Sequence, residues 1–260
     1  MKSSYYKYFA ALLLFGFNGI VASNINLPSY EIVLLRLLLG SLFLITVFTV
    51  SRQRFTFYRN KHTCLYLFIS ASAMGASWML LYEAYQQVGI SIASLAYYCG
   101  PVIVMILSPF LFRETLTWPK IAGFLTVLAG MCLVNLQALD EGKTIWGLFC
   151  GLMSAFMYAL MVTANKKAKP ESGLENSLLQ LVIGSFIVVA FVSMQKNFVL
   201  SLTTIDWIPV LLLGLLNTGI GCYLYFSSIT DLPVQTVAIC GYLEPVSYTH
   251  LRAHETDQYL

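Results

Sequence analysis

The sequence predicts an all-α fold, a polytopic membrane helix bundle, and three observations support this prediction. Apolar segments recur along the whole chain, most of them near the ~20 residues that an α-helix needs to cross the hydrocarbon of a bilayer. Hydrophobic residues make up 58% of the sequence and charged residues 10%, which leaves too little polar surface for a soluble domain of 260 residues. Lysine and arginine are concentrated in every second gap between the apolar segments.

The predicted helices follow one another with short gaps. The complete apolar segments cover about 8–23, 30–50, 64–82, 91–112, 121–138, 145–164, 176–194 and 208–229, and another segment begins near Val234 and ends early. A signal peptide is the alternative for the first segment, because Lys2 and Lys7 precede it and residues 21–23 resemble a cleavage site. The alternation of basic and non-basic gaps favours a helix that is retained in the mature protein, because the alternation includes this segment as the first span.

The charges predict the orientation in the membrane. The N-terminus and the gaps after the second, fourth and sixth segments contain Lys2, Lys7, Arg52, Arg54, Arg59, Lys61, Arg113, Lys120, Lys166, Lys167 and Lys169. The other gaps contain only Lys143 and Lys196. Because short cytoplasmic loops carry the positive excess, we expect a multi-pass protein of the cell membrane with a cytoplasmic N-terminus. These loops explain the net charge of +3, so it gives no reason to expect nucleic acid as a partner.

The chain contains a weak internal repeat. A shift of 144 residues aligns 84–102 with 228–246, which places Pro101 on Pro245 and Tyr98 on Tyr242. The shift spans five predicted helices, an odd number, so the second copy enters the membrane from the opposite side. Inverted repeats of this kind build many secondary transporters, whose substrate site lies near the midplane where the halves meet.

The two aligned prolines lie at matching depth. Pro101 and Pro245 are each about ten residues into their helices, or roughly 15 Å from the membrane surface. Proline removes one backbone hydrogen bond and kinks a helix, so we expect both residues to act as hinges or to shape a cavity. The alternative is that membrane helices simply tolerate each proline.

These residues resemble a known family. Arg36 and the segment GISIASLAYYCGPVIVMILSPFLFRETLT at 89–117 resemble the EamA-like branch of the drug/metabolite transporter superfamily. In that family the fourth helix of each repeat contains small residues, a proline, an apolar run and a glutamate, which resemble Ala93, Pro101 and Glu114 here. The second copy is similar at Ala238, Glu244 and Pro245, and departs from the pattern after Val246.

The resemblance implies ten helices in two inverted five-helix repeats, with both termini in the cytoplasm. It also implies movement of small polar metabolites, often the export of amino acids, by alternating access. We expect the first repeat at 1–138 and a truncated second repeat at 139–246. Residues 247–260 are expected to be a non-native tail, because SYTHLRAHET resembles translated sequencing-adapter sequence. A genuine short tail is the alternative.

Polar and aromatic side chains within the membrane are the candidate substrate-binding residues. They are Arg36, Trp78, Tyr82, Tyr98, Asn217, Tyr242 and Glu244. Glu244 is a lone carboxylate at mid-depth that can bind a substrate amine or a proton, or a neighbouring helix. Structural alternatives hold for the others: an ion pair of Arg36 with Glu31 or Glu83, ordinary packing of the aromatic rings, and interhelical bonding by Asn217.

No enzyme is expected from this sequence. His62 is the only histidine before the tail, no catalytic or nucleotide-binding motif occurs, and the six cysteines form no CxxC pair. We therefore expect neither a cofactor nor a metal. The expected partners are a small-molecule substrate and the lipid bilayer, with a homodimer left open. The alternative function is a non-catalytic membrane or lipid-handling protein.

Overall fold

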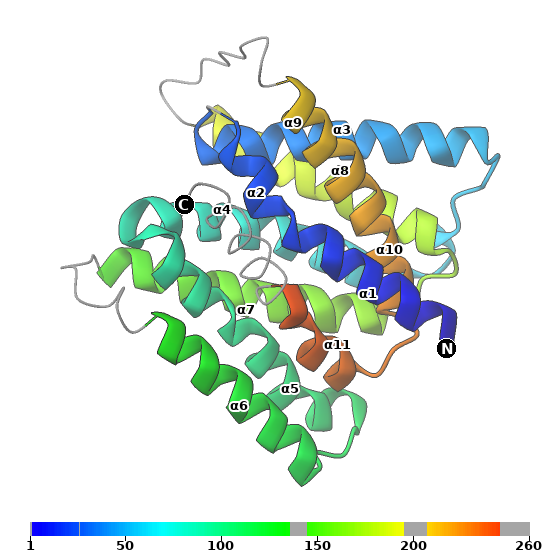
Figure 1. Cartoon of the computed structure of the whole chain (residues 1–260). Coiled ribbons are helices and arrows are strands. Elements are labelled where there is room, and N and C mark those ends of the chain that lie inside the picture. The colour runs from blue at the N-terminus through cyan, green and yellow to red at the C-terminus, as the bar shows by residue number, and fades with distance from the viewer. Residues whose placement is uncertain (1, 26, 136–144, 195–206, 245–260) are drawn as a thin grey trace.

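The computed structural model describes residues 2–25, 27–135, 145–194 and 207–244, and every regular element in these ranges is a helix (Figure 1). Its elements are α1 (Lys2–Gly16), α2 (Asn18–Ser23), α3 (Ser29–Val50), the 3₁₀ turn η1 (Phe57–Arg59), α4 (Lys61–Tyr97), α5 (Cys99–Phe112), α6 (Trp118–Asn135), α7 (Ile145–Ala168), α8 (Gly173–Ser193), α9 (Trp207–Leu211), the π-helix η3 (Leu212–Ile220), α10 (Gly221–Ser228) and α11 (Val234–Gly241).

Seven of the described helical stretches are long and apolar enough to cross a membrane, which confirms the predicted fold class. They include the combined stretches of α1 with α2 and of α9, η3 and α10. The segment predicted at 121–138 is helical as α6, but α6 is not among the seven. The helix predicted from Val234 is present as α11.

The segments predicted at 64–82 and 91–112 are confirmed as two candidate spans, Lys61–Gly89 and Ile92–Phe112. Their connection is shorter than expected, because helical structure continues through it as α4 and only Gly89 leaves the helical conformation. Gly89 interrupts the helix with φ 78° and ψ 162°, a conformation that glycine adopts at little cost. A sharp kink at one residue therefore replaces the expected connection.

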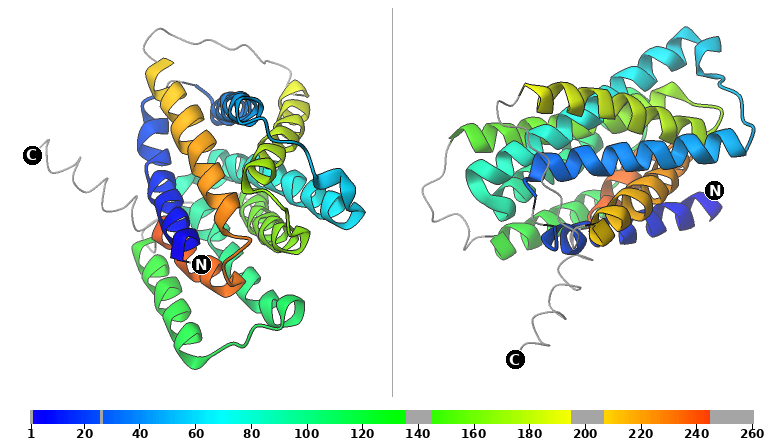
Figure 2. Two further views of the ribbon diagram at one scale, coloured as in Figure 1. Left: turned by 90° about the vertical axis from the view of Figure 1, so that its right-hand side faces the viewer. Right: turned by 90° about the horizontal axis from the view of Figure 1, so that it is seen from above.

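Helices related by the shift of 144 residues pack against one another. Where α3 crosses α8, the Oγ atoms of Ser41 and Ser185 are 3.0 Å apart, and these serines are 144 positions apart in sequence. Small residues allow close approach nearby, since a Cβ added to Gly75 would lie 2.9 Å from the carbonyl oxygen of Gly184. α1 and α10, which come from different predicted repeats, also pack against each other and lie side by side in Figure 2. This packing agrees with the predicted inverted repeat.

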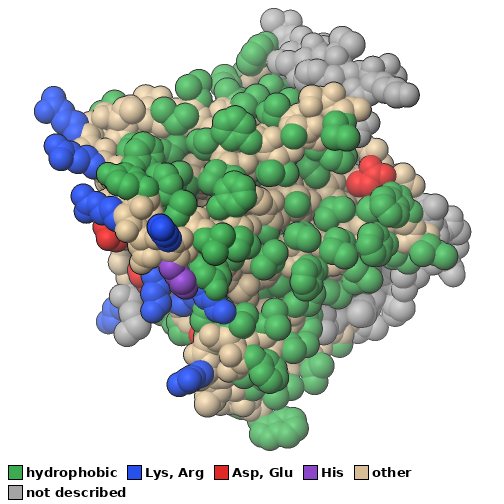
Figure 3. Space-filling view, turned by 180° about the vertical axis from the view of Figure 1, so that it is seen from behind, with side chains coloured by type: hydrophobic (Ala, Val, Ile, Leu, Met, Phe, Trp, Pro, Cys, Tyr) green, Lys and Arg blue, Asp and Glu red, His purple; other side chains and the backbone are tan. Residues whose placement is uncertain are grey.

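Charge and apolar surface are segregated on the outside of the bundle. Figure 3 shows lysine and arginine gathered at one end and a broad hydrophobic surface beyond it. We call this the basic end; it contains the end of α3 with Arg52, the end of α5 with Arg113 and the end of α7 with Lys166. Large apolar side chains elsewhere point outward, among them Phe110 at 81% exposure. Such a surface suits a lipid environment.

Candidate functional site

Two breaks in the helices lie at the positions related by the repeat. α4 ends at Tyr97 and α5 begins at Cys99, with ψ near −2° at Tyr98. Pro101 lies buried in the first turn of α5, where its missing N–H leaves the carbonyl of Tyr97 without the usual helical donor. α11 ends in the same way, because Tyr242 has φ −70° and ψ −7°.

The two breaks touch each other. The Tyr242 hydroxyl donates a hydrogen bond of 2.8 Å to the backbone carbonyl of Tyr98, and the two ring centroids are 6.4 Å apart. Pro245, the second predicted hinge, lies outside the described residues. The structure thus brings Tyr98 and Tyr242 together, while hinge motion at Pro101 and Pro245 stays a prediction.

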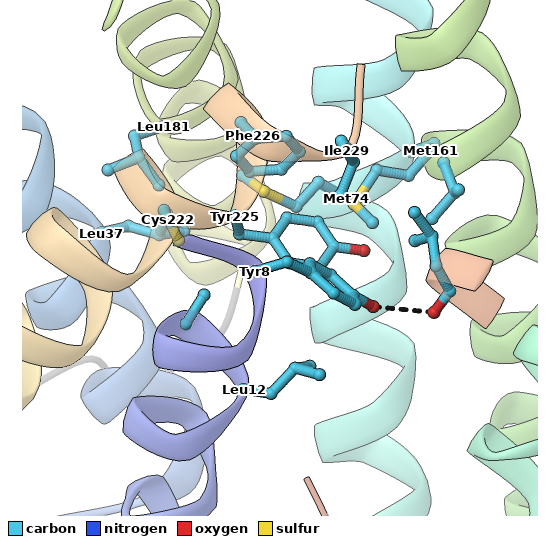
Figure 4. Close-up of a cluster of buried hydrophobic side chains, with 14 of the residues drawn as sticks. Tyr8, Leu12, Leu37, Met74, Met161, Leu181, Cys222, Tyr225, Phe226 and Ile229 are labelled. Carbon is cyan, nitrogen blue, oxygen red and sulfur yellow. Dashed lines mark hydrogen bonds between the residues drawn. The ribbon is translucent and has the colours of Figure 1, made fainter. Parts of the chain in front are cut away.

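A cluster of tyrosines continues from this contact into the bundle. Tyr97 meets Tyr158 of α7 edge to face at 5.5 Å between centroids, and the hydroxyls of Tyr158 and Tyr225 are 3.3 Å apart. Tyr225 of α10 lies 5.7 Å from the ring of Tyr8 on α1. The Tyr8 hydroxyl donates to the carbonyl of Val237 at 2.7 Å, the bond drawn in Figure 4. These rings join helices of both predicted repeats.

Sequence reasoning missed three members of this cluster, Tyr8, Tyr158 and Tyr225. Each lies within a predicted apolar segment, where a buried hydroxyl needs a partner, and this was the signal available in the sequence. Tyr223, also on α10, does not join the cluster; the Lys7 ammonium lies 5.8 Å from its ring centroid.

Arg36 is the candidate cation of the site. Its guanidinium carbon lies 4.0 Å from the ring centroid of Trp78, and the residue is only 7% exposed. A desolvated cation–π contact of this kind contributes about 2 kcal/mol or more. Its Nε is buried and has no hydrogen-bond partner among the residues that the structure describes. Within the described residues no ion pair joins Arg36 to Glu31 or Glu83, so the structure does not support the predicted alternative.

The candidate anion is Glu244, the last described residue. It is half-buried, and its carboxyl lies near enough to Arg36 for their charges to interact. Tyr8, Tyr97 and Tyr158 also interact electrostatically with this carboxyl. The arrangement offers a cation on one side, an anion on another and aromatic walls with hydroxyl groups between them. It can bind a small molecule that carries both charges.

Two further predicted residues lie apart from this tyrosine cluster. Tyr82 packs edge to face against Tyr85, with 5.3 Å between the centroids. Asn217, in the π-helix η3, is 2% exposed, and its amide nitrogen donates to the carbonyl of Leu14 at 3.1 Å and to Asn18 Oδ1 at 2.9 Å. Asn217 therefore joins η3 to both α1 and α2, and its contact with substrate stays a prediction.

Comparison with known proteins gives a consistent result. The sequence model of the EamA-like transporter family matches residues 3–136 and 145–252. An uncharacterized transporter of Bacillus subtilis, YxxF, is 26% identical over 246 residues, which cover 92% of this chain and 77% of that protein. A biotin transporter of Salmonella typhimurium is 22% identical over 183 residues, or 69% of this chain and 61% of that protein.

A solved crystal structure supports the fold. It matches with a TM-score of 0.80 at 18% identity and covers 96% of this chain and 87% of that chain. The family match includes most of both predicted repeats, although residues 247–260 lie outside the described ranges and the predicted tail stays untested. With its apolar spans, the paired helix breaks and this match over most of its length, the chain belongs to the EamA-like transporter family.

Proposed function

We propose that this multi-pass membrane protein is a carrier of the cell membrane that exports small polar metabolites, amino acids first among them, by alternating access. Family membership and the apolar helices support membrane transport in general. The observation that carries the substrate class is Arg36, a buried guanidinium on Trp78 with an unpartnered Nε and with Glu244 within reach of its charge. The predicted cytoplasmic N-terminus places the basic end inside the cell.

A buried arginine without an ion pair is costly, and a bound carboxylate would offset that cost. Charged side chains within a membrane are retained mainly where they face a partner, a cavity or a pathway. Guanidinium binds carboxylate in a planar, two-bond geometry. The amine of an amino acid would then face Glu244, and its side chain would lie among the tyrosine rings. We propose no catalytic activity and no cofactor for this site.

The predicted repeats, 1–138 and 139–246, would be the two halves that move. Their helix breaks at Tyr98 and Tyr242 meet beside the tyrosine cluster, which makes them the proposed hinge region together with Pro101 and Pro245. Alternating access in carriers of this architecture is a movement of one repeat against the other around a fixed central site.

A lipid-handling function is the second candidate, and one observation favours it. A groove between α3, α8 and the end of η3 is lined mainly by apolar residues, including Val47, Leu174, Ile220 and Tyr223. A lipid chain can occupy a groove of this kind. The groove contains neither Arg36 nor Glu244, so a lipid function leaves both residues unexplained.

A flux assay separates the two candidates. Vesicles that contain the protein would be loaded with one unlabelled L-amino acid, or with biotin because one similar protein is a biotin transporter, and then given the labelled compound. We expect saturable counterflow of at least one carboxylate-bearing compound. Movement of a fluorescent phospholipid between leaflets, without counterflow of any tested compound, would support the lipid function and reject our proposal.

A further inference from the structure

The connection between α10 and α11 is held by polar contacts from several other helices. We call residues 229–233 the basic-end junction. The Lys166 ammonium of α7 donates to the backbone carbonyls of Thr230 at 2.5 Å and of Leu232 at 2.6 Å. From α1, the hydroxyl of Ser4 donates to Asp231 Oδ2 at 2.8 Å. Side chains of both predicted repeats therefore hold this short connection.

Glu114 fixes the start of α11. Its two carboxylate oxygens accept hydrogen bonds from the backbone N–H groups of Val234 at 2.7 Å and Gln235 at 3.0 Å. A carboxylate at this position satisfies free N–H groups of the helix and interacts favourably with the helix dipole. Gln235 is completely buried and bonds to Lys120 Nζ at 2.6 Å and to Ser108 Oγ at 2.8 Å. These bonds join α11 to α5 and α6.

Below the tyrosine cluster, these contacts surround an apolar plug. Phe226, Ile229, Leu232 and Val234 are each no more than 2% exposed and lie in one hydrophobic cluster with Tyr8 and Tyr225. Figure 4 shows Phe226 and Ile229 of this cluster together with the two tyrosines. By contrast, Trp78 and Glu244 of the candidate site, and Tyr97 of the cluster itself, remain partly exposed. The path from the site towards the basic end is therefore closed by packed side chains.

We propose that Glu114 and Lys166 are gating residues that hold the basic end of the transport pathway closed. The bonds of Lys166 to the basic-end junction and of Glu114 to the first turn of α11 must break before α10 and α11 can separate from α5 and α7 and admit substrate from that side. Glu114 comes from the first predicted repeat, and it acts on the first turn of α11 in the second repeat. The proposal rests on the transport function above, but its test requires no substrate.

The test uses Cys222 as a native reporter. This thiol is 2% exposed and lies close enough to Arg36 to interact with its charge. The other cysteines would be replaced by alanine, and the protein would be placed in vesicles of known orientation. A membrane-impermeant cationic methanethiosulfonate would then be added on the basic side or on the opposite side.

We expect Glu114→Ala to raise the modification rate of Cys222 from the basic side about tenfold, because a helix-capping carboxylate is lost. Reaction from the opposite side should slow, since opening one end closes the other. Lys166→Met should act in the same direction. Glu171→Ala, a matched loss of an exposed carboxylate at the basic end, should leave both rates unchanged.

Two outcomes would overturn the gating role. One is an equal rise in the modification rates from the two sides, which would indicate a general loosening of the fold. The other is that neither Glu114→Ala nor Lys166→Met changes these rates. A disulfide between cysteines at Ser4 and Asp231 is the converse test and needs no weakened variant. This disulfide should suppress modification of Cys222 from the basic side and stop flux until the disulfide is reduced. If the reagent still reached Cys222 from the basic side in the cross-linked protein, the gate would also be rejected. If the rates behave as expected but no flux is found, the transport function fails and the gate stands.

Discussion

The basic-end junction and the kink at Gly89 occupy related positions in the two predicted repeats, but they are held differently. At the basic end, Lys166 and Glu114 bond to backbone groups on either side of the connection. At the opposite end, Val88 packs so closely on α7 that a Cβ on Gly147 would lie 2.5 Å from its side chain. The difference teaches that repeats with the same helix order can hold one end with charges and the other with apolar contacts.

This difference gives the two ends different energies of opening. Hydrogen bonds to charged groups contribute more than contacts between neutral groups, roughly 1.5–3 kcal/mol each. A protein with two conformations populates the one whose closed end is better held. The predictions below test this comparison, from the largest expected effect to the smallest.

The orientation of the two ends gives an all-or-none result. Single cysteines at Arg54, at the basic end, and at Gly142, outside the described residues, would be introduced into a cysteine-free protein. We expect an impermeant thiol reagent added to intact cells to label the Gly142 position and not the Arg54 position, because positive loops stay in the cytoplasm. Labelling at position 54 from outside would show that the basic end, and with it the proposed gate, faces the outside of the cell.

The next effect concerns a buried amide network near the basic end. Asn176 is fully buried and exchanges hydrogen bonds of 3.0 and 3.1 Å with Asn165, and it donates to the carbonyl of Phe226 at 2.9 Å. We expect Asn176→Leu to lower the free energy of unfolding by roughly 2 kcal/mol, because buried polar groups lose their partners. Thermal unfolding in detergent measures this change.

The control for this network is Thr126→Val. The Thr126 hydroxyl is exposed and donates to the carbonyl of Ala122 in its own helix, its one hydrogen bond within the described part of the chain, so its loss should change the unfolding temperature little. An equal loss of stability in both variants would show that the buried network contributes nothing special to the basic end.

A smaller effect is expected at the opposite junction. Gly89 has φ 78°, so Gly89→Ala should destabilise the protein by about 1–2 kcal/mol through backbone strain. Gly123→Ala is the matched control, because nothing lies within 4 Å of a Cβ there and alanine favours the helix. Equal unfolding temperatures for the two variants would contradict the strained geometry at Gly89.

The sequence predicted the helices well because hydrophobicity alone decides which segments enter a bilayer. The repeat also predicted that Tyr98 and Tyr242 are equivalent, and the structure places them in contact. Periodicity could not show which face of an apolar helix points inward, so Tyr8 and Tyr158 were missed. The kink at Gly89 was missed because a single glycine does not reveal its dihedral angles.

The partner of Arg36 could not be predicted for a related reason. The sequence offered Glu31 and Glu83 as ion-pair partners, whereas the structure places the guanidinium on the ring of Trp78. Which of these groups Arg36 meets depends on how α3 and α4 are rotated about their axes. The role of Asn217 was equally ambiguous. An amide in a membrane helix uses the same N–H and C=O groups to bond to a neighbouring helix or to a ligand. Such choices are made by packing between helices, which local sequence does not specify.

The central claim is that Arg36 binds the carboxylate of a transported molecule, and one variant tests it most directly. Arg36→Gln loses the contact with Trp78 but also removes a buried charge that has no ion pair in the described residues; because the two effects oppose each other, the unfolding temperature should change little. Counterflow of the best labelled amino acid should fall at least about tenfold, the effect of losing one charged hydrogen bond. Glu83→Gln, whose carboxylate bonds to Gln87 at 3.1 Å, is the control and should keep its flux. Wild-type flux in Arg36→Gln, or a loss of stability that matches the loss of flux, would contradict the account.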